Sequence, residues 1–513
     1  ELLRSSVPTL CFVRLALIQF FVNFHLKSLL SRLFFVFSLT FLPPYEIIRL
    51  IRLTHIYARY IDMENTLSAL LKKYDSYDYY IKDKIKRDTE EYRKGQFALV
   101  FTDSDGNTLD DVKVSVKQVR HEFKFGGTTF YLNGFTDDMR NKEFERLFTD
   151  IFNYAVIPVY WDTLELVDGQ ERFLPESPFV SRRPPIDTCM DFCRRNSLRA
   201  KAHCLVYNSF QPDWIPENNR DLKIRIDKRI RRLAEHCGDF FEDIDVINEM
   251  ISIYKNCYKG NAMRNMQIAD EHDHEKWAFQ TAEKYFPYSR LFWNEGGFES
   301  FANPNYRGHR SFYYMTLKDN IAKGAPIGGI GMQFHCYSER DNAAAVLDTL
   351  CNPLRLIDVF DCYGAFGLPM HISEVNIPSW SNEAEDEFLQ AELTERLYRL
   401  WFSSKNVESA VWWTFADGTA YPTENVFYGG LIRNDCTPKP AYERLDRLIN
   451  SEWNTSFEVT ADKRLDFRGF YGDYVVSAEC GGKTCTQTLR LYHDTTGFDN
   501  RLCDFRSKRL VLT

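Results

Sequence analysis

Between about residues 122 and 450, short apolar runs alternate with longer stretches whose apolar residues recur at helical spacing. Eight of these runs have the length and composition of buried β-strands, and they lie at residues 123–130, 155–160, 198–206, 244–248, 290–294, 328–335, 370–375 and 410–415. Helical stretches such as 219–236 and 383–403 separate them. Eight strands that alternate with helices predict an α/β protein with a closed (β/α)8 TIM barrel over residues 122–450, rather than an open sheet.

Different patterns flank the predicted barrel on both sides. Residues 63–95 have a charged helical pattern, and residues 96–121 alternate as strands around a turn at 103–107, which predicts a β-hairpin. Residues 451–493 return to strand alternation. We expect them to form a small accessory β-module that pairs with this hairpin, and we assign no element to the tail at 494–513.

The first 62 residues differ in composition from the rest. They hold seven Lys or Arg against three Asp or Glu, and their apolar runs at 15–26 and 33–45 are shorter than the roughly 20 residues of a membrane span. The first methionine is Met63. If translation starts near Met63, the segment is upstream read-through and we expect a cytoplasmic protein; if the segment acts as a signal, we expect secretion.

Charge and cysteine content narrow the choice of partners. The net charge of −8 argues against nucleic acid, because phosphate contacts require clustered Lys and Arg. The 13 cysteines form no CxxC pair, which argues against a disulfide framework and favours a reducing compartment. Cys189 and Cys193 lie one helical turn apart and fit a buried helix face better than a metal site. We expect no metal, no organic cofactor and a monomer.

Polar residues stand where several predicted strands end. Asn248 and Glu249 end the fourth strand, and Glu374 ends the seventh. The carboxyl ends of barrel strands carry the functional residues, because the loops open a cleft there. One such glutamate alone is as well explained by a buried salt bridge, whereas two on strands that lie nearly across the barrel favour catalysis.

Glycoside hydrolysis requires such a pair of carboxyl groups. One donates a proton to the leaving oxygen and the other attacks the anomeric carbon. We assign Glu249 as the acid/base and Glu374 as the nucleophile, since the charge of Glu374 would keep Glu249 protonated. Asn248 would donate a hydrogen bond to the sugar.

The order of the strand-end motifs resembles glycoside hydrolase family 10, the endo-β-1,4-xylanases. The matching stretches are KAHCLVYNSFQPDWIP, DVINEM, GIGMQFH, HISEVNIPS and WWTFADGTAY followed by GGLIRNDCTPKPAYERL. The resemblance implies the same two catalytic glutamates and a retaining cleavage of xylan. It also implies sugar-binding roles for His203, Asn248, Gln333 and Trp413, and a hydrogen bond from His335 to the nucleophile.

The chain departs from the family pattern at the edges of the site. Tyr207 and Asn208 stand where the family has Trp-His, Tyr421 stands in place of a second cleft-lining Trp, and Tyr160 replaces a sugar-gripping Lys. We include Tyr207, Asn208 and Tyr421 among the candidate substrate-binding residues.

These departures leave alternatives to xylan cleavage open. One is a related retaining barrel glycosidase that acts on another β-1,4-glycan or on xylo-oligosaccharides. The other is a non-catalytic carbohydrate-binding protein. In each case the expected partner is a polysaccharide or oligosaccharide, with xylan the first candidate.

Overall fold

The computed structural model describes residues 71–251, 274–297, 300–303, 306–493 and 507–513. The chain divides into a unit of residues 1–67 and a unit of residues 68–513, and all described residues belong to the second. The predictions for residues 1–62 and for the start of the helix at 63–95 therefore fall outside the described residues. The remainder of that helix is present as α4 (Asp78–Tyr92).

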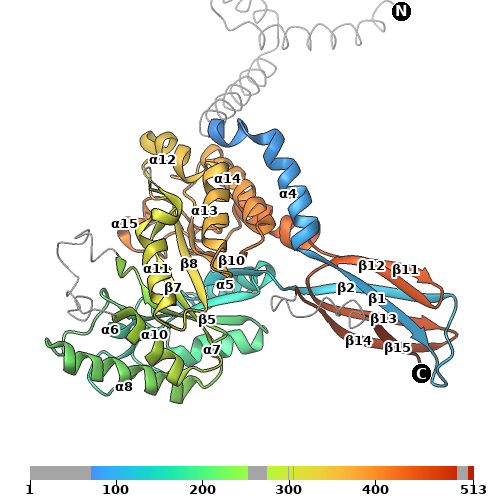
Figure 1. Cartoon of the computed structure of the whole chain (residues 1–513), viewed down its shortest axis with the longest axis horizontal. Coiled ribbons are helices and arrows are strands. Elements are labelled where there is room, and N and C mark those ends of the chain that lie inside the picture. Colours follow the sequence, from blue (N-terminus) through green and yellow to red (C-terminus); the bar gives the residue numbers. More distant parts are fainter. Residues whose placement is uncertain (1–70, 252–273, 298–299, 304–305, 494–506) are drawn as a thin grey trace, which may run out of the picture. The chain divides into compact units, whose positions relative to one another are not determined.

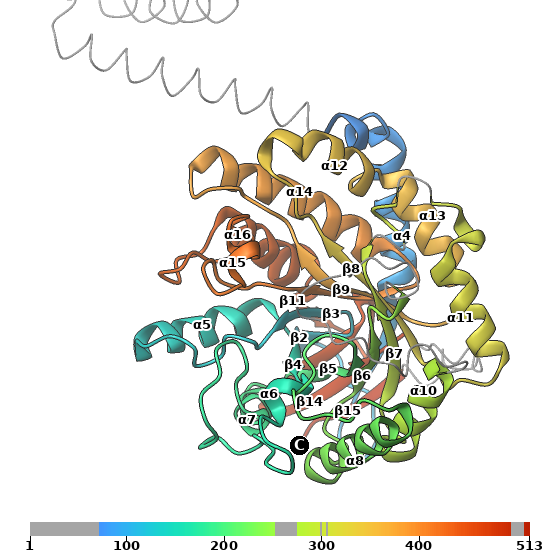
Figure 2. The same ribbon diagram turned by 90° about the vertical axis from the view of Figure 1, so that its left-hand side faces the viewer.

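Eight parallel strands close into a barrel whose order around the ring follows the chain (Figures 1 and 2). The strands are β3 (Lys124–Thr128), β4 (Tyr154–Pro158), β5 (Arg199–Tyr207), β6 (Asp243–Asn248), β7 (Arg290–Glu295), β8 (Gly329–His335), β9 (Met370–Asn376) and β10 (Val407–Trp412). The predicted (β/α)8 fold is thus confirmed, and each predicted strand overlaps an observed one. All residues of β3, β4, β6 and β9 are buried, as expected for strands covered on both faces.

Helices surround the strands in Figure 2. They are α5 (Asp138–Ile151), α6 (Trp161–Leu164), α7 (Ile186–Arg195), α8 (Asn219–Cys237), α10 (His274–Tyr285), α11 (Phe312–Ala322), α12 (Ala343–Leu350), α13 (Pro353–Gly364), α14 (Ala384–Ser403), α15 (Pro422–Asn425) and α16 (Pro440–Arg447). In α8, the Asn218 side chain caps the N-terminus, and Leu222, Ile226 and Leu233 are buried at helical spacing. None of the described helices combines the length and apolar character of a membrane span.

The N-terminal ends of the strands hold a buried ion-pair cluster. Lys124 contacts both Asp243 and Glu408, and Arg290 contacts the same two carboxylates at 2.8 Å and 2.6 Å. His371 bonds Glu408 at 2.9 Å. The spacing of Asp243, His371 and Glu408 would suit a metal ion, but the two cations already neutralise their charge, so we interpret the cluster as structural.

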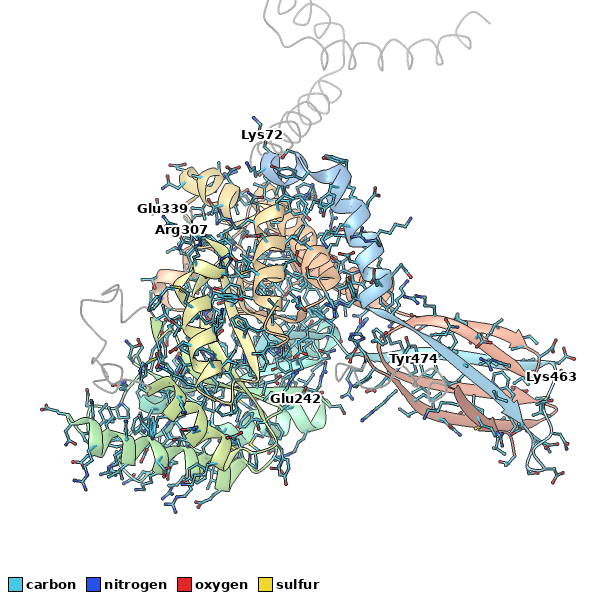
Figure 3. All side chains as sticks on the ribbon, in the orientation of Figure 1. Lys72, Glu242, Arg307, Glu339, Lys463 and Tyr474 are labelled. Atoms are coloured by element: carbon cyan, nitrogen blue, oxygen red, sulfur yellow. The ribbon has the colours of Figure 1, made fainter. Side chains whose placement is uncertain are left out.

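Two small sheets form a β-sandwich from the segments on either side of the barrel. One sheet has the order β12-β1-β15 and the other β11-β2-β13-β14. The strands are β1 (Lys94–Thr102), β2 (Val112–His121), β11 (Ser456–Ala461), β12 (Arg464–Phe470), β13 (Gly472–Cys480), β14 (Lys483–Leu491) and β15 (Ser507–Val511). Their inward side chains share one core, in which Tyr474 is buried (Figure 3).

The sandwich corrects two predictions. β1 and β2 do not form a hairpin: β1 pairs with β12 and β15, whereas β2 pairs with β11 and β13. Period-two alternation indicates that a strand has one buried face but does not specify its neighbour, and here the two strands belong to different sheets that share one core. The tail, to which no element was assigned, contains β15, where Leu510 is fully buried.

Candidate active site

Two glutamates stand at the C-terminal ends of opposite barrel strands. Glu249 directly follows β6, and Glu374 lies near the end of β9. Glu249 has φ 53°, in the left-handed region that non-glycine residues rarely occupy. Such backbone conformations cost free energy and cluster at functional sites. The loop after β6 therefore holds this carboxyl group in a position that an unconstrained chain would not favour.

Glu249 is half-buried and accepts hydrogen bonds at both carboxylate oxygens. The Tyr207 hydroxyl donates to Oε2 at 2.6 Å, and Nε2 of Gln333 donates to Oε1 at 2.7 Å. Burial raises the pKa of Glu249 above its usual value, and the negative charge of Glu374 raises it further. The two hydrogen bonds oppose that rise because they favour the charged form. Glu249 is thus biased towards carrying a proton.

Glu374 is only 3% exposed and is held on both oxygens. Asn294 donates from Nδ2 to Oε1 at 2.8 Å, and Nε2 of His335 contacts Oε2 at 2.9 Å. The contact that the sequence implied for His335 is therefore present. Because both oxygens have partners on neighbouring strands, the orientation of the carboxylate is fixed by the barrel wall.

Asn294 joins the two strand ends and was not predicted. Its Nδ2 donates to Oδ1 of Asn248 at 2.8 Å as well as to Glu374, and its own Oδ1 accepts from Ser373. A Cβ atom at Gly331 would come within 2.3 Å of Oδ1 of Asn294, so glycine is required there. One signal was available: the predicted strand at 290–294 ends in a polar residue, like the strands that carry the glutamates.

His203 is oriented by a buried carboxylate from the next strand. Its Nδ1 lies 2.9 Å from Oδ2 of Asp245, whose Oδ1 lies 2.6 Å from Nζ of Lys201. Nε2 of His203 faces Glu374 Oε1 at 4.0 Å and has no hydrogen-bond partner among the described residues. Neither Asp245 nor Lys201 was predicted, because both lie inside the predicted strands and not at their ends.

Trp412 and Trp413 point to opposite sides of β10, as strand geometry predicts. The indole of Trp412 is fully buried and donates to the Gly429 carbonyl oxygen at 2.9 Å. The ring of Trp413 lies edge-on to His203 and His335, with centroid distances of 5.7 Å in each case. Trp413 is therefore the tryptophan that belongs to the candidate site.

The two remaining predicted residues, Asn208 and Tyr421, form no hydrogen bond with either glutamate in the described part of the chain. Asn208 is buried, and its Oδ1 lacks a hydrogen-bond partner within the described part of the chain. The Tyr421 hydroxyl accepts a hydrogen bond from Arg183 at 2.7 Å, and the Tyr421 ring stacks on Phe210 at 6.2 Å. Tyr421 thus belongs to a second group of residues beside the glutamates.

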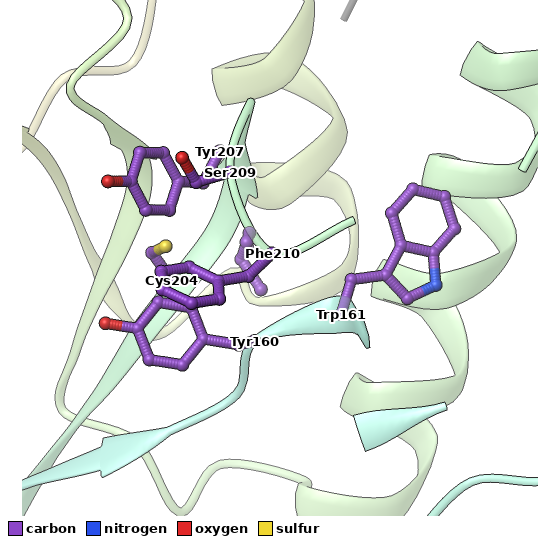
Figure 4. A pocket seen from close by; sticks show the side chains of 7 residues that line it. Tyr160, Trp161, Cys204, Tyr207, Ser209 and Phe210 are labelled. Carbon is purple, nitrogen blue, oxygen red and sulfur yellow. The ribbon is translucent and has the colours of Figure 1, made fainter. Parts of the chain in front are cut away.

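A small pocket adjoins the site at the ends of β4 and β5. Its lining residues are Tyr160, Trp161, Cys204, Leu205, Tyr207, Ser209 and Phe210. Figure 4 shows the rings of Tyr207, Phe210 and Tyr160 gathered on one side, with the Trp161 indole directed away from them. Because Tyr207 also bonds Glu249, the pocket and the pair of glutamates share a wall. Flat aromatic faces of this kind suit sugar rings.

The fold and the site together define a barrel protein of the glycoside hydrolase type, with a glutamate pair at the C-terminal strand ends. The family model described as "Glycosyl hydrolase family 10" matches residues 183–447. The chain belongs to glycosyl hydrolase family 10.

Two proteins that are similar to this chain in sequence carry different names. The chain is 25% identical over 401 residues to "Endo-1,4-beta-xylanase 2" of Arabidopsis thaliana, covering 75% of this chain and 32% of that protein. It is 24% identical over 422 residues to "Anti-sigma-I factor RsgI6" of Acetivibrio thermocellus, covering 78% of this chain and 47% of that protein. The chain thus spans 32% and 47% of the length of these two relatives.

Among solved structures, xylanase 10B from Thermotoga petrophila RKU-1 in complex with xylobiose is similar, with a TM-score of 0.51 and 20% identity. The match covers 64% of this chain and 95% of that one. At this level of identity the likeness concerns the fold.

Proposed function

We propose that this protein is a retaining, endo-acting glycoside hydrolase that cleaves β-1,4-xylosidic bonds in xylan by double displacement. The observation that carries the proposal is the unequal environment of the two glutamates. Glu249 has a raised pKa, whereas Glu374 is clamped by Asn294 and His335. Paired carboxyl groups with different environments are what acid/base and nucleophile roles require.

Glu249 is the general acid in the first step. It protonates the glycosidic oxygen while a carboxylate oxygen of Glu374 attacks the anomeric carbon, so that the C–O bond to the leaving sugar breaks and a covalent glycosyl-enzyme forms. Ester formation removes the negative charge of Glu374, and with it one cause of the raised pKa of Glu249. Glu249 then accepts a proton from water, which attacks the ester and restores Glu374.

The surrounding residues position the sugar for this reaction. Oδ1 of Asn248 accepts a hydrogen bond from Asn294, which leaves the amide nitrogen of Asn248 to donate elsewhere. We assign this nitrogen as the donor to the sugar 2-hydroxyl. His203 offers Nε2, Gln333 extends from β8, and Trp413 provides an apolar wall. A retaining reaction needs the two carboxyl groups about 5–5.5 Å apart. The charge coupling between Glu249 and Glu374 supports a close spacing.

Xylan is the preferred substrate because several relatives are named endo-1,4-β-xylanases. A second candidate is a non-catalytic carbohydrate-binding role, since one similar protein is named as an anti-sigma factor and not as a glycosidase. Both glutamates and their hydrogen-bond donors are present in this chain, which supports catalysis over binding alone.

Release of reducing sugar from xylan, barley β-glucan and mannan, assayed side by side, tests the proposal. We expect turnover of xylan with the β-anomer as the first product in NMR spectra, and no turnover by Glu374→Ala, which should still bind xylan. Turnover of glucan or mannan alone would assign another substrate. Xylan binding without hydrolysis by the wild type would assign the non-catalytic role.

A further inference from the structure

Two adjacent arginines are buried beside the candidate site without a carboxylate partner among the residues that the structure describes. Arg182 and Arg183 lie in the loop that leads into α7 and are only 7% and 3% exposed. Within the described part of the chain, no carboxylate oxygen lies within 4.0 Å of a nitrogen of either guanidinium. Buried arginines are normally paired, because an isolated charge in a protein interior is costly.

The contacts of the two side chains leave donors unused. Arg183 donates from Nη1 to the Arg182 carbonyl oxygen at 2.9 Å and from Nη2 to the Tyr421 hydroxyl at 2.7 Å. Arg182 donates from Nη1 to the Thr419 carbonyl oxygen. Nε of Arg183 and both Nε and Nη2 of Arg182 are buried without a hydrogen-bond partner among the described residues. Every hydrogen bond that the two guanidinium groups donate is thus to a neutral acceptor, and three of their buried nitrogen atoms have no acceptor among the described residues.

The loop that carries the arginines is held rigidly. Arg172 is buried and donates to the carbonyl oxygens of Thr163, Pro178 and Arg183 at 2.6 Å, 2.8 Å and 3.1 Å. Arg182 adopts φ 62°, a left-handed conformation that this frame maintains. The guanidinium groups are therefore positioned before any ligand arrives, which reduces the entropy that binding would cost.

Arg183 contacts two of the aromatic rings that line the pocket described above. The Arg183 guanidinium lies 4.1 Å from the ring centroid of Tyr160 and 5.3 Å from that of Phe210, and both residues line the pocket. Tyr160 in turn lies edge-on to His203 at 5.3 Å. Tyr160, which follows β4, therefore lies between Arg183 and His203 and connects the arginine pair to the candidate site.

Two acidic side chains interact electrostatically with the arginines, but neither pairs directly with a guanidinium group. Glu424 acts on Arg182, and Asp162 interacts with Arg183, but neither forms an ion pair with them within 4.0 Å. Burial lowers the pKa of Arg182, and the negative charge of Glu424 opposes this effect only in part. A hydroxyl group offers only a dipole, whereas a carboxylate offers a full charge and paired acceptors that match the guanidinium fork.

We infer that Arg182 and Arg183 bind the carboxylate of an acidic sugar, so that the preferred glycan carries uronic acid side groups. The inference deepens the proposed function and rests on it. The Tyr160, Phe210 and Tyr421 rings would enclose the body of that sugar while the arginines hold its carboxylate.

The test compares glucuronic-acid-substituted xylo-oligosaccharides with the same oligosaccharides after reduction of the carboxyl group to a primary alcohol. For the wild type, we expect kcat/KM on the acidic form to exceed that on the reduced form by at least about tenfold. In Arg182→Gln and Arg183→Gln this ratio should collapse towards one. Arg231→Gln, which alters an exposed cation on α8, should keep the wild-type ratio.

Equal kcat/KM values of the wild type on the two substrates would overturn the inference. This comparison uses the wild type alone, so it does not depend on whether a variant folds. An equal loss on both substrates in the arginine variants would also overturn it, since the side chains would then bind hydroxyl groups. If no xylo-oligosaccharide is hydrolysed, the proposed function fails instead. Calorimetry with Glu374→Ala then decides the inference separately: tighter binding of the acidic form supports it, and equal binding rejects it.

Discussion

The hydroxyl group of Tyr207 donates a hydrogen bond of 2.6 Å to Oε2 of Glu249. It lowers the pKa of Glu249, in opposition to burial and to the charge of Glu374, which raise it. Tyr207 was expected to contact the substrate, yet the structure also makes it a partner of the candidate acid/base. The tyrosine that stands here in place of the family's Trp therefore affects the proton affinity of Glu249.

Tyr207→Phe should therefore shift the pH dependence of hydrolysis. The variant lacks a donor that favours the charged form, so the pKa of Glu249 rises further and the basic limb of kcat/KM moves to higher pH. The profile should be measured on xylan and on a short xylo-oligosaccharide. A limb that stays in place while KM rises would show that Tyr207 acts only through the sugar.

Glu249→Ala should remove that basic limb altogether. A general acid must be protonated, so wild-type activity falls as the pH rises through the raised pKa of Glu249. Loss of the acid should lower kcat/KM, which reports formation of the glycosyl-enzyme, by about 10²–10⁴-fold on xylan, and by much less on aryl xylosides whose leaving group needs no proton. Equal losses on both kinds of substrate would argue against the acid role.

Asn294→Ala should lower kcat while leaving the fold intact. The variant deletes the donor shared by Asn248 and Glu374, so both side chains lose their alignment. Misplacement of reacting groups by about 1 Å costs on the order of 10²-fold in rate. Steady-state kinetics would separate kcat from KM, and Ser373→Ala, which removes only a bond to Asn294, should have a smaller effect. A loss of activity that merely follows a lower Tm would indicate a structural role.

Lys124→Met tests the ion-pair cluster at the opposite end of the barrel. Removing the ammonium leaves Asp243 buried beside Glu408, which should cost about 3–5 kcal/mol of unfolding free energy at neutral pH. The cations hold the pKa values of Asp243 and Glu408 below their usual range. The stability that these carboxylates contribute is present above the carboxyl pKa of the unfolded chain and is lost as the pH falls through the folded-state pKa. The difference in unfolding free energy between variant and wild type should therefore shrink in acid.

Urea unfolding at several pH values would measure this difference. Lys82→Met is the matched control, because Lys82 forms an exposed ion pair with Asp78 on α4 and should change stability by no more than about 1 kcal/mol. A pH-independent effect of Lys124→Met would point to lost packing instead.

Much of the barrel could be predicted because its signal is local. A strand such as β4 is covered on both faces, so its five buried residues, Tyr154–Pro158, form one apolar run. The partners of β1 and β2 could not be predicted in this way. Their alternation marks a buried face, but the choice between pairing with each other and pairing with β12 or β13 depends on strands more than 340 residues away.

The sequence by itself determined the barrel, the order of its strands and the position of Glu249 and Glu374 at strand ends, since each follows from periodicity along a short segment. The tertiary structure decided what surrounds those carboxyl groups. Asn294, Asp245 and the arginine pair 182–183 are ordinary polar residues in the sequence, and only the closure of the ring brings them together. Hydrogen bonds and charge coupling act over a few ångströms of space, which distance along the chain does not reveal.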